Sequence, residues 1–138
     1  MSARGKPQLV ARLVWASLLG TVPLYCAALV VLLGSGAGDP KPALADRLRA
    51  ILLVLAAGQT LAIWLVWRRF VAPAGYEPAE RTDAQRVLTM QLVCWALCET
   101  IALSGFVIGL IARRIEPVFF VWALAALLVL RPRSESAP

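Results

Sequence analysis

The sequence predicts an all-α membrane protein with four transmembrane helices, and three observations support this fold class. Apolar residues make up 60% of the 138 residues, compared with about 45–50% in soluble domains. Charged residues make up only 16%, and they lie mainly at the borders of apolar segments. The mean hydropathy is +0.75. A surface with so little charge cannot cover the apolar residues, so much of the apolar surplus has to face lipid.

Four apolar runs define the expected helices within one transmembrane domain of residues 1–138: 13–33, 48–67, 87–112 and 118–130. A hydrocarbon core of about 30 Å requires about 20 helical residues, and the first three runs meet that length. The fourth has only 13 residues. Pro117 suits the first turn of a helix, and Arg131 can extend its charge to the interface, so we expect this run to span as well. The alternative is an interfacial or re-entrant segment.

The distribution of lysine and arginine predicts the orientation of the chain. Nine of these residues lie in the N-terminal segment, the polar loop 68–86 and the C-terminal segment, and five lie in the two other loops. Cytoplasmic loops carry the excess of basic residues, so both termini and the loop 68–86 are expected in the cytoplasm. The same bias explains the net charge of +6. No basic run is long enough to follow a nucleic-acid backbone, so nucleic acid is not an expected partner.

The residue inventory argues against several classes of function. Histidine is absent, which removes the commonest ligand of metals and haem. Cys26, Cys94 and Cys98 all lie in apolar runs, where they form neither a disulfide pattern nor a metal-ligand set. No nucleophile–base pair or phosphate-binding loop is evident. We therefore expect no metal, no cofactor and no enzymatic activity.

Glu99 is the sharpest candidate for a functional residue. It lies near the centre of the run 87–112, and therefore near the middle of the bilayer. Ionising a carboxylate there costs about 2.5–3.5 kcal/mol or more, so the side chain should hold a proton unless a cation is close. Gln59, Thr60 and Thr21 lie at a similar depth and are its candidate hydrogen-bonding partners. The pattern predicts a proton- or ion-binding site; the alternative is a neutral acid that only hydrogen-bonds to a neighbouring helix.

The same run carries small residues that predict close helix packing: Cys94, Cys98, Ala102, Gly105, Gly109 and Ala112. Spacings of three and four residues keep them on one face of a helix. Small side chains allow another helix to approach closely, so this face should pack on protein rather than lipid. The neighbouring helix can belong to the same chain or to another protomer, and we expect a homo-oligomer or a subunit of a membrane complex.

Residues 96–107 read Ala-Leu-Cys-Glu-Thr-Ile-Ala-Leu-Ser-Gly-Phe-Val. This segment resembles the proton-binding helix of the proteolipid subunit c of rotary ATP synthases and V-type ATPases, which has the form Ala-Leu-x-Glu-(Ser/Ala)-x-Ala-Ile-x-Gly-(Leu/Phe)-Val. The resemblance implies that Glu99 is the ion-binding carboxylate and that the preceding loop is cytoplasmic. A shift of 78 positions places Thr21 on Glu99. This weak internal repeat suggests two tandem helical hairpins, as in V-type proteolipids.

Three functions remain open from the sequence. The first is a proteolipid-like protein whose Glu99 exchanges a proton. The second is a non-catalytic membrane subunit or scaffold in which Glu99 is a buried hydrogen-bonding group. The third is a small proton-coupled transporter. In each case we expect a multi-pass protein of the bacterial cytoplasmic (inner) membrane, with the lipid bilayer as its surroundings.

Overall fold

The computed structural model describes the backbone of residues 5–36, 38–72 and 81–132, and the side chains of residues 8–36, 38–72 and 85–132. Its elements are α1 (Gly5–Gly34), α2 (Pro42–Val66), the π-helix η1 (Trp67–Val71), α3 (Arg81–Ala112) and α4 (Pro117–Val129). Three segments are long and apolar enough to cross a membrane: Gln8–Gly34, Pro42–Val71 and Gln85–Ala112. For these described residues the all-helical class with four α-helices is confirmed, and α4 is a shorter apolar helix.

Three of the helices are longer than the apolar runs that predicted them. α1 begins at Gly5, α3 begins at Arg81, and η1 continues α2 as far as Val71. Hydropathy detects only the apolar part of a helix, whereas backbone hydrogen bonds continue into polar residues at its ends. The polar segment between α2 and α3 is correspondingly shorter than the expected loop 68–86, and residues 73–80 lie outside the described residues.

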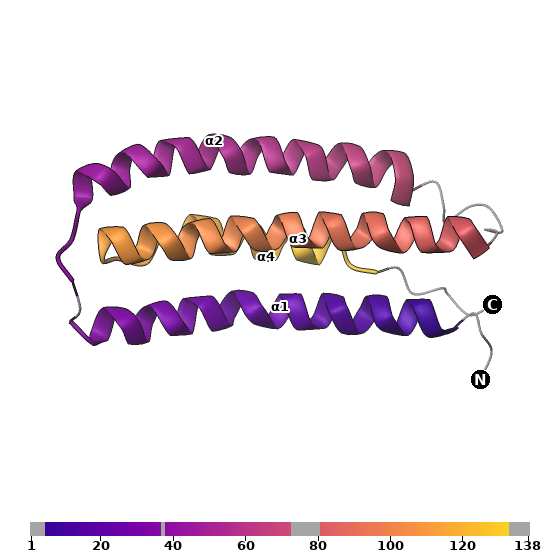
Figure 1. Ribbon diagram of the computed structural model, residues 1–138, viewed down its shortest axis with the longest axis horizontal. Coiled ribbons are helices and arrows are strands. Elements are labelled where there is room, and N and C mark those ends of the chain that lie inside the picture. The colour runs from indigo at the N-terminus through magenta and orange to yellow at the C-terminus, as the bar shows by residue number, and fades with distance from the viewer. Residues whose placement is uncertain (1–4, 37, 73–80, 133–138) are drawn as a thin grey trace.

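α3 is the centre of the bundle. In Figure 1 it lies between α2 and α1, with α4 behind it. α1, α2 and α4 all pack against α3, and α4 also packs against α1. α1 and α2 are not among the closely packed pairs in the described part of the chain. The helices therefore form one bundle around α3, and the first two helices do not close on each other as a separate hairpin.

The small residues of α3 lie inside this bundle. Five are buried and Ala112 is half-buried: Cys94, Cys98, Ala102, Gly105, Gly109 and Ala112. A Cβ atom on Gly105 would come within 2.6 Å of the Cβ of Phe119 on α4, and one on Gly109 would overlap the side chain of Leu29 on α1. The two glycines let α4 and α1 approach α3 closely. This face of α3 is therefore used for packing within the chain.

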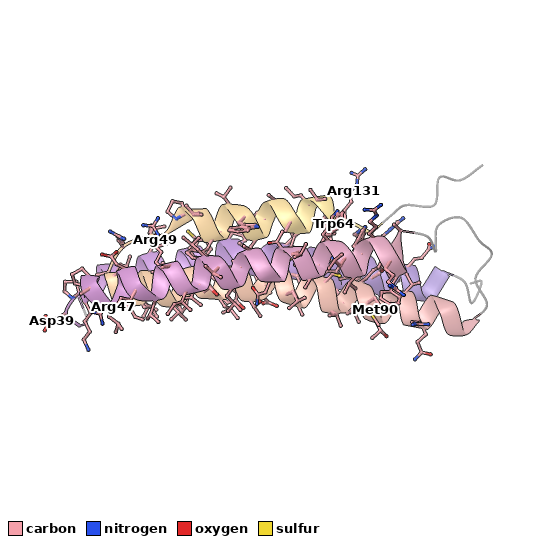
Figure 2. All side chains as sticks on the ribbon, turned by 90° about the horizontal axis from the view of Figure 1, so that it is seen from above. Asp39, Arg47, Arg49, Trp64, Met90 and Arg131 are labelled. Atoms are coloured by element: carbon pink, nitrogen blue, oxygen red, sulfur yellow. The ribbon has the colours of Figure 1, made fainter. Side chains whose placement is uncertain are left out.

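α4 ends before it has run the length of the bundle. It has 13 residues, or about 20 Å of helix. Figure 2 shows α3 continuing well beyond the level of Arg131, which follows α4. The last carbonyl groups of a helix have no hydrogen-bonding partner within that helix. A helix that stops at this point therefore needs donors from elsewhere.

Two tryptophans supply those donors. The indole N–H of Trp15 on α1 donates to the carbonyl oxygen of Leu127 at 2.8 Å. The indole N–H of Trp95 on α3 donates to the carbonyl oxygen of Leu130 at 2.9 Å, and Trp95 is fully buried. The C-terminal end of α4 is thus hydrogen-bonded from two neighbouring helices.

Charged groups connect the opposite end of the bundle, where α3 turns into α4. Glu116 is only 3% exposed, and its Oε1 accepts a hydrogen bond from Arg114 Nε at 2.7 Å. Its Oε2 lies 3.5 Å from Arg49 Nη2 on α2, and Arg114 also lies 3.7 Å from Asp46. The buried carboxylate therefore links the α3–α4 turn to the start of α2. Figure 2 shows Arg49 toward this end.

Candidate functional site

Glu99 lies midway along α3 and is half-buried. Arg86 stands 13 residues before it and Arg113 stands 14 residues after it. At about 1.5 Å per residue, each arginine is about 20 Å away along the helix. The carboxyl group is therefore at the centre of the apolar part of α3, far from the charged residues at both ends of that helix.

The hydrogen-bonding partner of Glu99 is Tyr25 on α1. The phenolic O–H donates to Oε1 of Glu99 at 2.7 Å. The ring of Tyr25 also contacts Phe106, with a distance of 6.1 Å between the ring centroids. A phenol can donate to a carboxylate or to the carbonyl oxygen of a protonated acid. The contact therefore fits Glu99 with or without a proton, and it supplies a dipole rather than a countercharge.

The three candidate partners expected from their depth make other hydrogen bonds. Thr21 and Thr60 each donate to a backbone carbonyl of their own helix, at 2.7 and 2.8 Å. Gln59 Nε2 donates to the hydroxyl of Thr100 at 3.0 Å. The structure thus brings Gln59 to α3 at the level of the acid, where it binds the residue that follows Glu99.

Sequence reasoning did not select Tyr25. The signal was nevertheless available, since a tyrosine inside an apolar run carries a hydroxyl group that usually finds a hydrogen-bonding partner when it is buried.

Glu99 lies at the edge of an exposed face of α3. The exposed residues recur every three or four positions: Val93, Ala96, Thr100, Leu103, Val107 and Leu110. Because successive residues are about 100° apart around a helix, these side chains share one face, which looks out between α1 and α2. The Tyr25–Glu99 pair borders this face on the side of α1, and the Gln59–Thr100 pair borders it on the side of α2. The acid is therefore at the boundary of the bundle rather than in its core.

The three cysteines lie on two different helices and are free thiols. Cys94 and Cys98 are buried on α3, and Cys26 is half-buried on α1. The Sγ atom of Cys94 lies 3.9 Å from the carbonyl oxygen of Ile63 on α2. In the described part of the chain, no group of three or more histidine, cysteine, aspartate or glutamate side chains is arranged to hold a metal ion.

No protein-family model matches the sequence, and no curated protein or solved structure is significantly similar to it. The class of protein therefore follows from its own fold and site. It is a helical bundle with three helices of membrane-spanning length and composition, and a carboxyl–phenol pair joins α3 to α1 part-way along both helices.

Proposed function

We propose that this chain is a small integral membrane protein whose Glu99 binds and releases a proton in the hydrocarbon region. In this proposal α1, α2 and α3 cross the membrane, and α4 together with residues 130–132 completes a fourth crossing. Both termini and the connection between α2 and α3 lie in the cytoplasm, because nine of the 14 basic residues lie in the segments 1–12, 68–86 and 131–138, at this end of the helices or beyond it. The membrane is the bacterial inner membrane.

The observation that carries this proposal is the position of Glu99 in the apolar middle of α3, where its partner is the phenol of Tyr25 at 2.7 Å. Glu99 is about 20 Å along the helix from Arg86 and Arg113, and holding a negative charge at that depth is unfavourable. A hydrogen bond from a neutral phenol stabilises the carboxylate without neutralising its charge. Glu99 can therefore hold a proton, and the phenol of Tyr25 can remain hydrogen-bonded to it with or without that proton.

Two further observations support the proposal. The segment 96–107 resembles the carboxylate-bearing helix of subunit c. Glu99 also borders the exposed face of α3, where a small reagent or another membrane subunit can reach it. The small residues of α3 are already covered by α1 and α4. An oligomer would therefore use exposed surface instead, including this face between α1 and α2.

The alternative is a membrane subunit or scaffold in which the Tyr25–Glu99 pair only joins α1 to α3. The specific observation in its favour is that the acid already has a partner inside the protomer. A glutamine at position 99 can still accept this hydrogen bond through its amide oxygen. If the role is only structural, Glu99→Gln should therefore preserve assembly and cellular phenotype.

Labelling by dicyclohexylcarbodiimide tests the proposal. This apolar reagent adds to a protonated carboxyl group, and the resulting O-acylisourea rearranges to a stable N-acylurea. In protein reconstituted into liposomes, mass spectrometry should find the adduct on Glu99, and labelling should fall as the pH rises. Glu99→Gln should abolish the adduct.

Glu116 provides the matched control, since it is also buried but is ion-paired with Arg114 and Arg49. Its carboxylate should remain unlabelled, and Glu116→Gln should leave labelling of Glu99 unchanged. An unlabelled Glu99, or labelling that survives Glu99→Gln, contradicts the proposal.

A further inference from the structure

A cluster of arginines and aromatic rings lies where α2 ends and α3 begins. The guanidinium Cζ of Arg68 is 5.2 Å from the ring centroid of Trp64. Arg86 of α3 is 5.2 Å from the ring centroid of Phe70, and Arg69 is 6.0 Å from the same centroid. All three arginines are exposed. Two arginines of η1 and one of α3 thus contact two aromatic rings at the end of α2 and in η1.

The π-helix η1 builds this cluster. The N–H of Ala72 donates to the carbonyl oxygen of Trp67 at 2.8 Å, which is the five-residue hydrogen bond of a π-turn. Such turns are rare in proteins overall, and those that occur are often found at functional sites. η1 packs against α3, and this packing brings Phe70 to Arg86. The wide turn therefore gathers arginines from two helices that are separated in sequence.

Among the described side chains, these three arginines form no ion pairs. There, the three guanidinium groups contact aromatic rings, whereas Arg49 and Arg114 form ion pairs with Glu116 and Asp46 at the other end of the bundle. The side chains of residues 73–84 lie outside the described set. Stacking on a ring uses the flat face of a guanidinium group and leaves its N–H edge available for a phosphate.

We infer that Arg68, Arg69 and Arg86 bind the phosphate groups of anionic phospholipids. The apolar surface beside the arginines favours a lipid over free phosphate, because Leu61 is 57% exposed, Trp64 52% and Leu65 51%. Acyl chains can lie on these residues while the headgroup reaches the guanidinium groups. An aromatic residue at the border of the apolar region suits the headgroup level. The inference rests on the proposed membrane placement, and it does not depend on a proton at Glu99.

The test compares two double variants that each remove two positive charges. Arg68→Gln/Arg86→Gln changes the cluster, whereas Lys41→Gln/Arg47→Gln changes exposed residues at the opposite end, where Figure 2 shows Arg47. Native mass spectrometry of protein released from mixed micelles would count bound phosphatidylglycerol against phosphatidylcholine. The unmodified protein should prefer phosphatidylglycerol. In the cluster variant this preference should fall about 25-fold, at about five-fold per arginine, and the control variant should retain it.

The result that overturns the inference is an unchanged preference in the cluster variant, or an equal loss in the control variant, which would make the preference a matter of total charge. Displacement of phosphatidylglycerol by inorganic phosphate would overturn the assignment to a lipid. If the double variant does not fold, Arg86→Gln alone should lose about five-fold, and no loss there overturns the inference. Carbodiimide labelling of Glu99 should be the same in all these variants, so the two proposals fail separately.

Discussion

Replacing Gly105 by leucine should detach α4 from α3 and lower the free energy of unfolding by about 3 kcal/mol or more. Even a Cβ atom at this position would come within 2.6 Å of the Cβ of Phe119. That atom is the root of a fully buried side chain, so it cannot rotate away and the backbones have to separate. Thermal unfolding in detergent, followed by circular dichroism, would measure the loss.

Gly58→Leu is the matched control. Gly58 lies on α2, and a Cβ atom there would have no neighbour within 4 Å. The substitution adds the same side chain on an exposed surface and improves helix propensity by up to about 1 kcal/mol. Stability should therefore stay the same or rise. Equal destabilisation by the two variants would contradict the close contact between α3 and α4.

The double variant Trp15→Phe/Trp95→Phe should loosen the C-terminal end of α4. Each substitution removes the donor to one carbonyl group, which belongs to Leu127 or Leu130. An unsatisfied buried carbonyl costs about 1–3 kcal/mol, and no water can replace the donor in hydrocarbon. Hydrogen–deuterium exchange of the last turn of α4 should become faster than in either single variant, with a lower unfolding temperature.

Trp122→Phe is the control for this pair. Trp122 is a half-buried residue of α4, and its indole N–H makes no hydrogen bond to the described residues. The change in side-chain volume is the same as in each single variant, but no carbonyl group of the described residues loses a partner. If Trp122→Phe accelerates exchange as much as the double variant, the indole hydrogen bonds do not hold the end of α4.

The helical class and three long helices could be predicted because an apolar run of about 20 residues has few alternatives to a spanning helix. The ends of these helices could not be predicted, because hydropathy does not detect helical residues that are polar. The length of α4 was evident from its 13 apolar residues. The hydrogen bonds that hold the end of α4 could not be predicted. Trp15 and Leu127 are 112 positions apart, and periodicity carries no information about such contacts.

The candidate site could be predicted in part. The position of Glu99 in an apolar run identified the residue, but a comparison of backbone depth selected Thr21 rather than Tyr25. Threonine hydroxyls in helices often bond to a carbonyl group one turn earlier, as Thr21 and Thr60 do. Tyr25 starts one turn further along α1, and long helical side chains point back toward the N-terminus of their helix. Its hydroxyl therefore reaches a different level from its Cα atom.

The small residues of α3 show a different limit of sequence reasoning. Their spacing predicted a packed face, and Gly105 and Gly109 are indeed the points where a Cβ atom would overlap a neighbour. The spacing could not say which helix is that neighbour. In the structure the neighbours are Phe119 and Leu29 of the same chain, so these glycines pack within the protomer.

We propose that Glu99 holds a proton in the apolar part of the membrane at neutral pH. Infrared spectroscopy of the reconstituted protein tests it most directly, because a protonated carboxyl group and a carboxylate absorb at different frequencies. We predict a protonated-acid band at neutral pH that shifts in Tyr25→Phe, disappears in Glu99→Gln and persists in Glu116→Gln. A spectrum in which Glu99 contributes only carboxylate bands at neutral pH would contradict the claim.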